Sequence, residues 1–122
     1  MSPLDLWRFL PLGYLFTIAI ETPILFFGLS PRHSKRRRIA AGIWLTACTY
    51  PIVTLVLPLL FENYSRAAYL TVAEIFAPAA ECALFWLAFG ATPDRSMWRD
   101  FAVIVVANLA SFLLGEISYR LI

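Results

Sequence analysis

Four long apolar stretches constrain this chain more than any other feature of its sequence. They cover residues 11–29, 39–61, 67–90 and 101–122. An α-helix needs about 20 mostly apolar residues to cross the hydrocarbon core of a bilayer, and each stretch is long enough to do so. Hydrophobic residues make up 61% of the chain and charged residues only 15%, which is too apolar for a soluble domain. We therefore expect an all-α membrane protein with four transmembrane helices, in a single domain over residues 1–122.

The connections between these stretches are too short to fold into a domain outside the membrane. Any chemistry must therefore lie between the helices or at their ends. No basic segment precedes the first stretch and no small-residue cleavage pattern follows it, so we expect a span there and not a signal peptide. Cys48 and Cys82 lie singly in apolar runs, which predicts small buried side chains and no metal-thiolate site. We expect no cofactor.

Basic residues gather in two of the three connections. The first connection carries five of them and the third carries two: Arg32, Lys35, Arg36, Arg37 and Arg38, and then Arg95 and Arg99. Because short cytoplasmic loops are enriched in Lys and Arg, we expect both of these connections in the cytoplasm and both termini outside. The expected location is a cell membrane, which for a bacterial protein is the inner membrane.

The basic run at residues 32–38 has two interpretations. Such a run is typical of a patch for anionic lipid or nucleic acid, and it is also typical of a simple topology anchor. We favour the anchor and expect no nucleic-acid partner. His33, the single histidine of the chain, lies in this connection. We expect it to be solvated, because a loop position does not suit a haem ligand or a buried base.

A motif occurs twice in the chain. Residues 28–40 and residues 90–102 both follow the pattern G-x-S/T-P-x-x-S-x-x-R-x-x-A. The pattern predicts two tandem repeats, residues 10–61 and 70–122, each a helical hairpin. Since both hairpins would start outside, the repeats would be parallel and related by a pseudo-two-fold axis along the membrane normal. The alternative is two unrelated hairpins with similar loops.

Extended along both halves, with a gap of two residues before the motif, the alignment also matches polar residues within the spans. The matched pairs are Glu21 with Glu81, Thr46 with Asn108, and Thr49 with Ser111. At 1.5 Å per residue, the first two pairs lie about 10 to 12 Å from the basic connections. The third pair lies one turn deeper on the same faces. An ionisable residue within a span costs about 3 kcal/mol, so such residues are rarely kept without a partner or a task.

Two further glutamates lie nearer the outside. Glu74 shares a face with Glu81, about 10 Å farther out, and is either a second layer of the same site or a hydrated carboxylate at its rim. For Glu116 we expect an ordinary helix-surface pair with Arg120, which follows at i+4.

Two glutamates that face one another in a low-dielectric space do not both ionise easily. They would share a proton or hold a cation between them. Hydroxyl and amide oxygens at the same level suit a proton, an alkali ion, Mg²⁺ or Ca²⁺. The sequence therefore predicts a proton- or cation-linked transporter, channel or coupling subunit, acting as a homodimer or in a larger complex. The predicted site consists of Glu21, Glu81, Asn108, Thr46, Thr49, Ser111 and Glu74.

Two alternatives remain open. The chain could be an accessory or assembly subunit whose buried glutamates pair with another membrane protein or bind a lipid or pigment. It could also be a membrane enzyme acting on lipids, with the Arg-rich connection at a head-group phosphate and a glutamate as acid or base. The enzyme is less favoured, because no nucleophile with an adjacent base can be identified.

Overall fold

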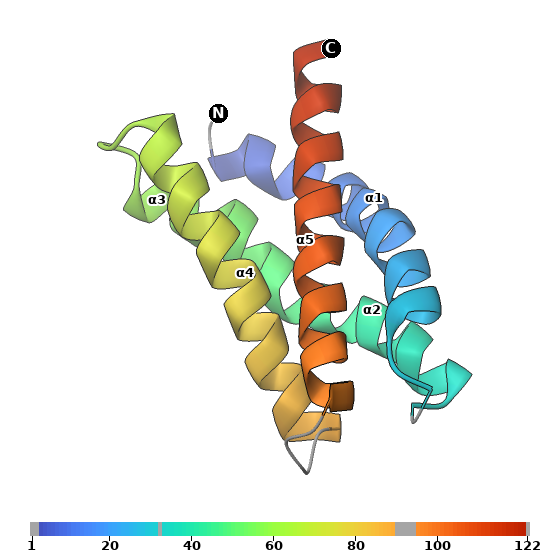
Figure 1. Ribbon diagram of the computed structural model, residues 1–122. Coiled ribbons are helices and arrows are strands. Elements are labelled where there is room, and N and C mark those ends of the chain that lie inside the picture. The colour runs from blue at the N-terminus through green and yellow to red at the C-terminus, as the bar shows by residue number, and fades with distance from the viewer. Residues whose placement is uncertain (1–2, 32, 90–94, 122) are drawn as a thin grey trace.

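The computed structural model describes residues 3–31, 33–89 and 95–121, and these parts of the chain contain helices and no strand. In chain order the helical elements are α1 (Pro3–Gly28), α2 (Lys35–Pro51), a π-helical segment η1 (Ile52–Val56), α3 (Leu57–Leu60), α4 (Arg66–Phe89) and α5 (Arg95–Leu121) (Figure 1). Because η1 and α3 continue α2, these three elements form one long helical segment, and α1, α4 and α5 form the other three. All four are long and apolar enough to cross a membrane: Pro11–Gly28, Lys35–Leu60, Arg66–Phe89 and Met97–Ile117. The predicted all-helical architecture with four such helices is confirmed.

Side chains are described for residues 11–31, 33–89 and 97–117. Several residues named above fall outside these ranges. They are Arg32, Arg95, Arg120 and residues 90–94 of the second motif.

The four helical segments form a ring in the order α1, α2, α4 and α5, so that α1 lies next to α5 although the two are far apart in the sequence. α1 packs mainly against α2 and α5, whereas α4 packs mainly against α5 and α2. The α1–α2 connection and the start of α5 lie at one end of the bundle, here called the basic end (Figure 1). The start of α1 and the α3–α4 connection lie toward the opposite end, here called the terminal end. Helices α1 and α4 therefore face one another across the ring.

Serine side chains cap two of the helices at their first turn. Ser34 precedes α2, and its hydroxyl oxygen accepts a hydrogen bond from the backbone amide of Arg37 at 3.1 Å. Ser65 precedes α4 and accepts from the backbone amide of Ala68 at 3.1 Å. A side-chain oxygen at this position satisfies an amide that has no partner within the helix. These caps fix where each span begins.

The second span changes its winding at Pro51. Proline has no backbone N–H, so one hydrogen bond of the regular pattern is lost there. The π-helical segment η1 follows directly, and in it the amide of Leu57 bonds to the carbonyl of Ile52. The hydroxyl of Tyr69 on α4 donates to the carbonyl of Val53 at 2.6 Å, which supplies a partner to the widened segment. Such single π-helical turns occur often near functional sites.

Two glycines allow α1 to approach its neighbours closely. A Cβ atom on Gly42 of α2 would lie only 2.9 Å from the Cα atom of Thr22. A Cβ atom on Gly28 would lie 2.6 Å from a methyl group of Val103 on α5. Small residues at helix crossings let backbones pack tightly in membranes. The crossings hold α1 at a fixed position against both α2 and α5.

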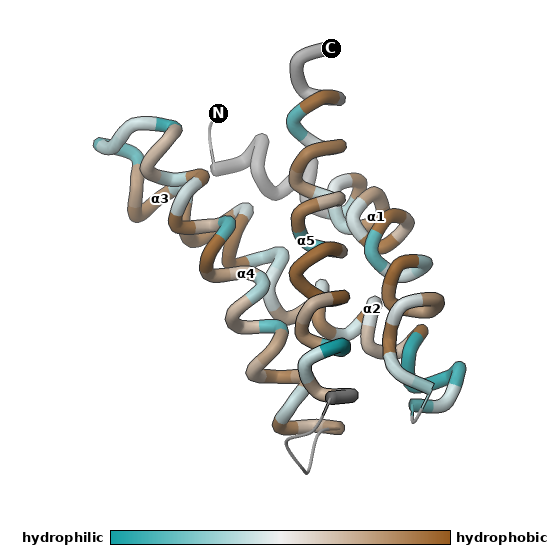
Figure 2. Tube along the Cα trace, viewed as in Figure 1, coloured by the Kyte–Doolittle hydropathy of each residue, from teal (hydrophilic) through white to brown (hydrophobic). Residues whose placement is uncertain are grey.

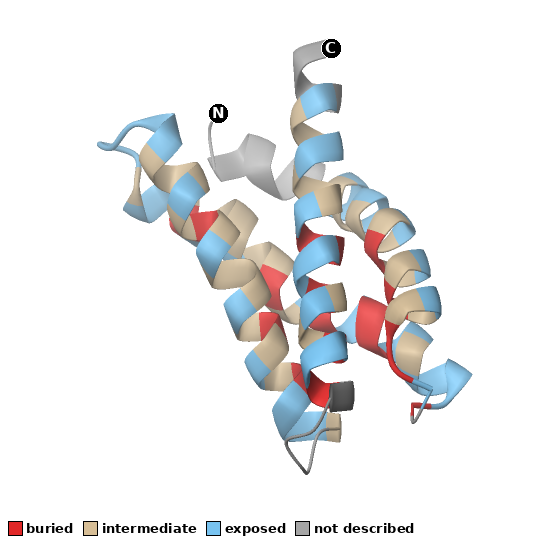
Figure 3. Ribbon diagram, in the orientation of Figure 1, coloured by how far each residue is buried: buried red, intermediate tan, exposed pale blue. Residues whose placement is uncertain are grey.

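A buried apolar cluster fills the half of the bundle nearest the basic end. It consists of Leu25, Leu29, Ala41, Leu45, Phe85, Ile104 and Ala107. Figure 3 shows the buried positions on the inward faces of the four helical segments, whereas the exposed positions face outward. The outward faces are largely apolar, with Phe27 78% and Leu87 73% exposed. In Figure 2 hydrophobic positions run along the helices, whereas the α1–α2 connection is hydrophilic. An apolar outer surface of this kind suits contact with lipid.

Candidate functional site

A cavity of about 370 Å³ lies between the helices, next to the apolar cluster. Its walls come from α1, α2, η1, α4 and α5. All seven residues of the predicted site line it: Glu21, Thr46, Thr49, Glu74, Glu81, Asn108 and Ser111. The fold therefore brings together side chains that are separated by as many as 90 residues in the sequence.

Glu81 is held by polar side chains of two neighbouring helices. Its side chain is buried, with 2% of the residue exposed. The hydroxyl of Thr49 on α2 lies 3.0 Å from its Oε2 atom. The Asn108 amide on α5 also interacts with this carboxyl group, while its Nδ2 donates to the carbonyl of Ile104 at 2.9 Å. Every one of these partners belongs to another helix of the ring.

Glu21 is equally buried but has fewer partners. It is also 2% exposed, and the hydroxyl of Ser111 on α5 lies 2.6 Å from its Oε2 atom. Its other oxygen, Oε1, has no hydrogen-bond partner among the described residues. The same holds for the buried hydroxyl of Thr46 on α2, within the part of the chain that the structure describes. A buried polar atom without a partner is costly, and these two atoms belong to residues of one cavity wall.

The two glutamate contacts run between the halves of the chain. The hydroxyl on α2 contacts the glutamate on α4, and the hydroxyl on α5 contacts the glutamate on α1. Exchanging α1 with α4 and α2 with α5 turns one contact into the other. The same exchange maps the ring of helix contacts onto itself. This is the contact pattern that a repeat of the two hairpins would produce.

Each hydroxyl also lies beside a backbone carbonyl. Thr49 Oγ1 is 3.0 Å from the carbonyl oxygen of Leu45, and Ser111 Oγ is 3.1 Å from that of Asn108. A hydroxyl has one hydrogen to donate, and a carbonyl oxygen can only accept. When the hydroxyl donates to the carbonyl, the glutamate can bond to it only as a protonated donor. When the glutamate is ionised, the hydroxyl can turn and donate to it instead. Either protonation state is therefore hydrogen-bonded without movement of the heavy atoms.

The cavity reaches an ion pair at the terminal end. Arg66 Nη2 lies 2.6 Å from Glu116 Oε1, and both residues line the cavity. Their side chains are 54% and 24% exposed, which marks this as the more accessible part of the wall. The predicted pair of Glu116 with Arg120 lies outside the described side chains, and the partner that the structure shows for Glu116 is Arg66, 50 residues away on α4. Glu74 is half-buried in the wall, on the same helix as Arg66.

The other side of the cavity is closed by apolar side chains. Leu25 and Phe85 each follow a site glutamate by one helical turn, toward the basic end. Ile104 precedes Asn108 by one turn in the same direction. All three are 1% exposed or less. The cavity therefore approaches the terminal end and is sealed from the basic end.

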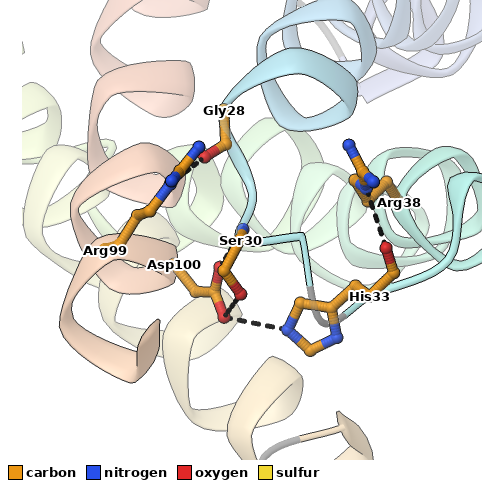
Figure 4. A network of polar contacts seen from close by, with 6 residues as sticks. All are labelled: Gly28, Ser30, His33, Arg38, Arg99 and Asp100. Carbon is orange, nitrogen blue, oxygen red and sulfur yellow. Dashed lines mark hydrogen bonds and ion pairs between the residues drawn. The ribbon is translucent and has the colours of Figure 1, made fainter. Parts of the chain in front are cut away.

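A second polar cluster lies at the basic end, and the sequence did not predict it. Asp100 accepts hydrogen bonds from the backbone amide and the hydroxyl of Ser30, at 2.7 and 3.1 Å (Figure 4). Nε2 of His33 lies 2.8 Å from the same carboxyl group. The expectation that His33 is solvated is wrong, because it is 1% exposed and packs edge-on against the ring of Phe85. The one feature of the sequence that could have indicated this cluster is Asp100, an acidic residue that follows a basic one at the start of the last span.

Two of the basic residues bond to backbone carbonyls at the end of α1, where Arg38 donates to the carbonyl of Phe26 at 2.8 Å and Arg99 donates to that of Gly28 at 2.9 Å. Arg38 also donates to the carbonyl of His33 in the connection at 3.0 Å, and Figure 4 shows this bond and the one from Arg99. The last carbonyls of a helix lack partners within it, and cations near them are favourable. These arginines therefore cap α1 in addition to any part they have in orienting the chain.

Within the described ranges, no group of three His, Cys, Asp or Glu side chains is placed to hold a metal ion. A cation in the cavity would instead be held by carboxyl, hydroxyl and amide oxygens. Cys48 and Cys82 are half-buried and unbridged. Comparison of the chain with protein-family models, with curated proteins and with solved structures gives no match.

Proposed function

We propose that this chain is a small multi-pass membrane transporter that carries a proton or a cation on Glu21 and Glu81. One observation carries the proposal. Two fully buried glutamates on opposite helices line the same cavity, and each has a hydroxyl from the other half of the chain beside it. Buried carboxyl groups outside a metal site are rare unless they have partners or a function.

The chemistry of the site supports reversible loading. A carboxyl group in a low-dielectric space is stabilised when it is neutralised, either by a proton or by a bound cation. The hydroxyls of Thr49 and Ser111 can hydrogen-bond to both the protonated and the ionised carboxyl group. Exchange of a proton for a cation then requires rotation of hydroxyl groups and no rebuilding of the site.

The shape of the cavity supports access from one side at a time. It approaches the terminal end and is closed by the apolar cluster toward the basic end. With the basic connections in the cytoplasm, this arrangement corresponds to an outward-facing state. Rocking of one hairpin against the other, as in transporters built from repeats, would expose the glutamates to the opposite side.

The test is flux into liposomes that contain the purified protein. Proton and alkali-cation fluxes are measured for the wild type, for Glu21→Gln and Glu81→Gln, and for Glu62→Gln as a matched control. Glu62 is an exposed residue of the α3–α4 connection and lies outside the cavity wall. We expect flux above empty liposomes for the wild type and the control, and background flux for the other two. Background flux for all four proteins would refute the transport proposal, and constant co-isolation with a larger complex would then favour an accessory subunit.

A further inference from the structure

We propose that the cavity binds an organic ammonium ion, meaning a protonated amine with a small apolar or aromatic body. This inference rests on the proposed function, because it treats the cavity as the transport site and names the class of its substrate. It stands on the volume, the charge and the lining of the cavity, and on the polar atoms that have no partner there.

The volume exceeds what an inorganic ion needs. At roughly 30 Å³ for each water in the liquid, about 370 Å³ corresponds to a dozen or so waters. Pockets for small organic ligands begin at roughly 300 Å³. A bare alkali ion or a hydronium ion would occupy only a small part of this space, whereas an amine with about ten heavy atoms fits it.

The charge of the wall selects a cation. Its ionisable carboxyl residues are Glu21, Glu74, Glu81 and Glu116, and Arg66 is the basic residue of the lining. Since Arg66 is paired with Glu116, three carboxyl groups remain for a ligand. Even with two of them protonated the wall stays negative. An anionic ligand would add a second negative charge beside a carboxylate that has no counter-charge.

Aromatic residues supply the surface for an apolar body. Phe16, Tyr50, Tyr69 and Phe112 all line the cavity. Aromatic side chains offer a large apolar contact area, and their ring faces attract cations within roughly 6 Å. The Tyr69 hydroxyl is already bonded to the carbonyl of Val53, which fixes the position of this ring. An inorganic ion would make no use of such a lining.

The unpartnered atoms match the donors of an ammonium group. Glu21 and Thr46 line the cavity from neighbouring helices, and their atoms Oε1 and Oγ1 are buried just behind its surface without a partner among the described residues. A primary ammonium group carries three N–H donors, which these atoms can accept once the two side chains turn toward the cavity. A quaternary ammonium ion has the same charge but no N–H donor. Comparison of the two ions therefore tests these atoms separately from the charge.

The exchange balances in protons and charge. A ligand that enters as R–NH₃⁺ brings one positive charge, and one protonated glutamate of the pair releases one H⁺ as it does so. When the ligand leaves, the glutamate takes up one H⁺ again. Binding of the amine is therefore coupled to the release of a proton, and the charge inside the cavity does not change.

Calorimetric titration of the purified protein tests the inference. The probes are phenethylammonium, the quaternary phenethyltrimethylammonium, the neutral 2-phenylethanol and the anion 3-phenylpropionate. We expect phenethylammonium to bind about tenfold more tightly than the neutral alcohol, and the anion not to bind. Binding in a weakly buffered solution should release a proton, seen with a pH-sensitive dye. Glu21→Gln should weaken phenethylammonium binding about tenfold, and Thr46→Val should weaken it while leaving the quaternary ion unaffected.

Size-exclusion profiles and helix content confirm that each variant is folded, and Glu62→Gln is expected to bind like the wild type. Equal affinities for the ammonium ion and the neutral alcohol, or an unchanged affinity in Glu21→Gln, would overturn the inference. Liposome flux separates this result from the proposed function. Proton or alkali-ion flux without phenethylammonium binding refutes the substrate class alone. Binding without flux of any ion keeps the ligand class and refutes the transport.

Discussion

The hydroxyl of Ser111 lies 2.6 Å from a carboxyl oxygen of Glu21, although the two residues are 90 positions apart in the chain. Thr49 and Glu81 make the corresponding contact at 3.0 Å. A hydroxyl beside a buried carboxyl group supplies the partner that lipid cannot supply. The two contacts join the halves of the chain at the level where the cavity is deepest in the bundle.

Removal of either hydroxyl should disturb the glutamate beside it. We expect Ser111→Ala to destabilise the protein by about 1 to 2 kcal/mol, because Glu21 loses its one observed partner. In a double-mutant cycle, Ser111→Ala should couple with Glu21→Gln and not with Glu81→Gln. Denaturation in detergent measures both effects. Equal coupling to the two glutamates would contradict the observed pairing.

Asp100 should contribute more to stability than any single exposed charge. The substitution Asp100→Asn replaces one of the two acceptor oxygens with an NH2 group, so the Ser30 amide and His33 can no longer both bond to a carboxyl oxygen, all in a buried setting. We expect a loss of about 3 kcal/mol. Arg36→Gln, at an exposed position of the same end, is the control and should change stability by under about 0.5 kcal/mol. A comparable small effect for Asp100→Asn would show that the cluster is not structural.

The crossing of α1 and α2 should not tolerate a methyl group. Gly42→Ala would place a Cβ atom 2.9 Å from the backbone of Thr22, so the helices would have to separate, at a cost of about 1 to 3 kcal/mol. Gly115→Ala is the matched control, since nothing lies within 4 Å of the Cβ position there. It should leave stability unchanged or raise it by up to about 1 kcal/mol through helix propensity. Thermal unfolding of both variants decides between these outcomes.

The Arg66–Glu116 pair should tune the affinity of the cavity with opposite signs. Arg66→Gln makes the wall more negative and should strengthen binding of phenethylammonium, whereas Glu116→Gln should weaken it. Because the pair is partly exposed, each change should be only a few-fold and should shrink in high salt. Titrations at two salt concentrations check this. A shift in the same direction for both variants would contradict an electrostatic effect.

The orientation in the membrane is testable with single cysteines in a Cys48→Ala, Cys82→Ala background. We expect Glu62→Cys to react with an impermeant thiol reagent applied to intact cells, because the α3–α4 connection is predicted to lie outside. Arg36→Cys should react only after the membrane is permeabilised. The reverse pattern would invert the predicted topology and place the cavity opening toward the cytoplasm.

Much of the site was predictable because it depends on regular geometry. The rise of 1.5 Å per residue places Glu21, Glu81 and Asn108 at similar depths once the spans are known, and all three line one cavity in the structure. Nothing in the hydropathy pattern could show which side chains of the other helices each of these three residues would contact. That depends on the order of the helices around the ring, which the sequence does not state.

What the sequence did not predict depends on contacts between distant segments. His33 was expected in water because it lies in a charged connection, but its ring is buried against Phe85 of α4 and Asp100 of α5. The contact of Arg66 with Glu116 likewise joins two helices at a separation of 50 residues. The π-helical winding after Pro51 also followed from no pattern that we could identify, since proline predicts only that regular winding is interrupted.

The bonds on Asp100 have a mechanical consequence. They fasten the connection of the first hairpin to the first turns of α5. At the terminal end the two hairpins are already joined by the α3–α4 connection and by the bond from Tyr69 to Val53, so they are clamped at both ends. If the protein transports as proposed, passage toward the cytoplasm would require the second clamp to open, which means breaking the bonds that Ser30 and His33 make with Asp100.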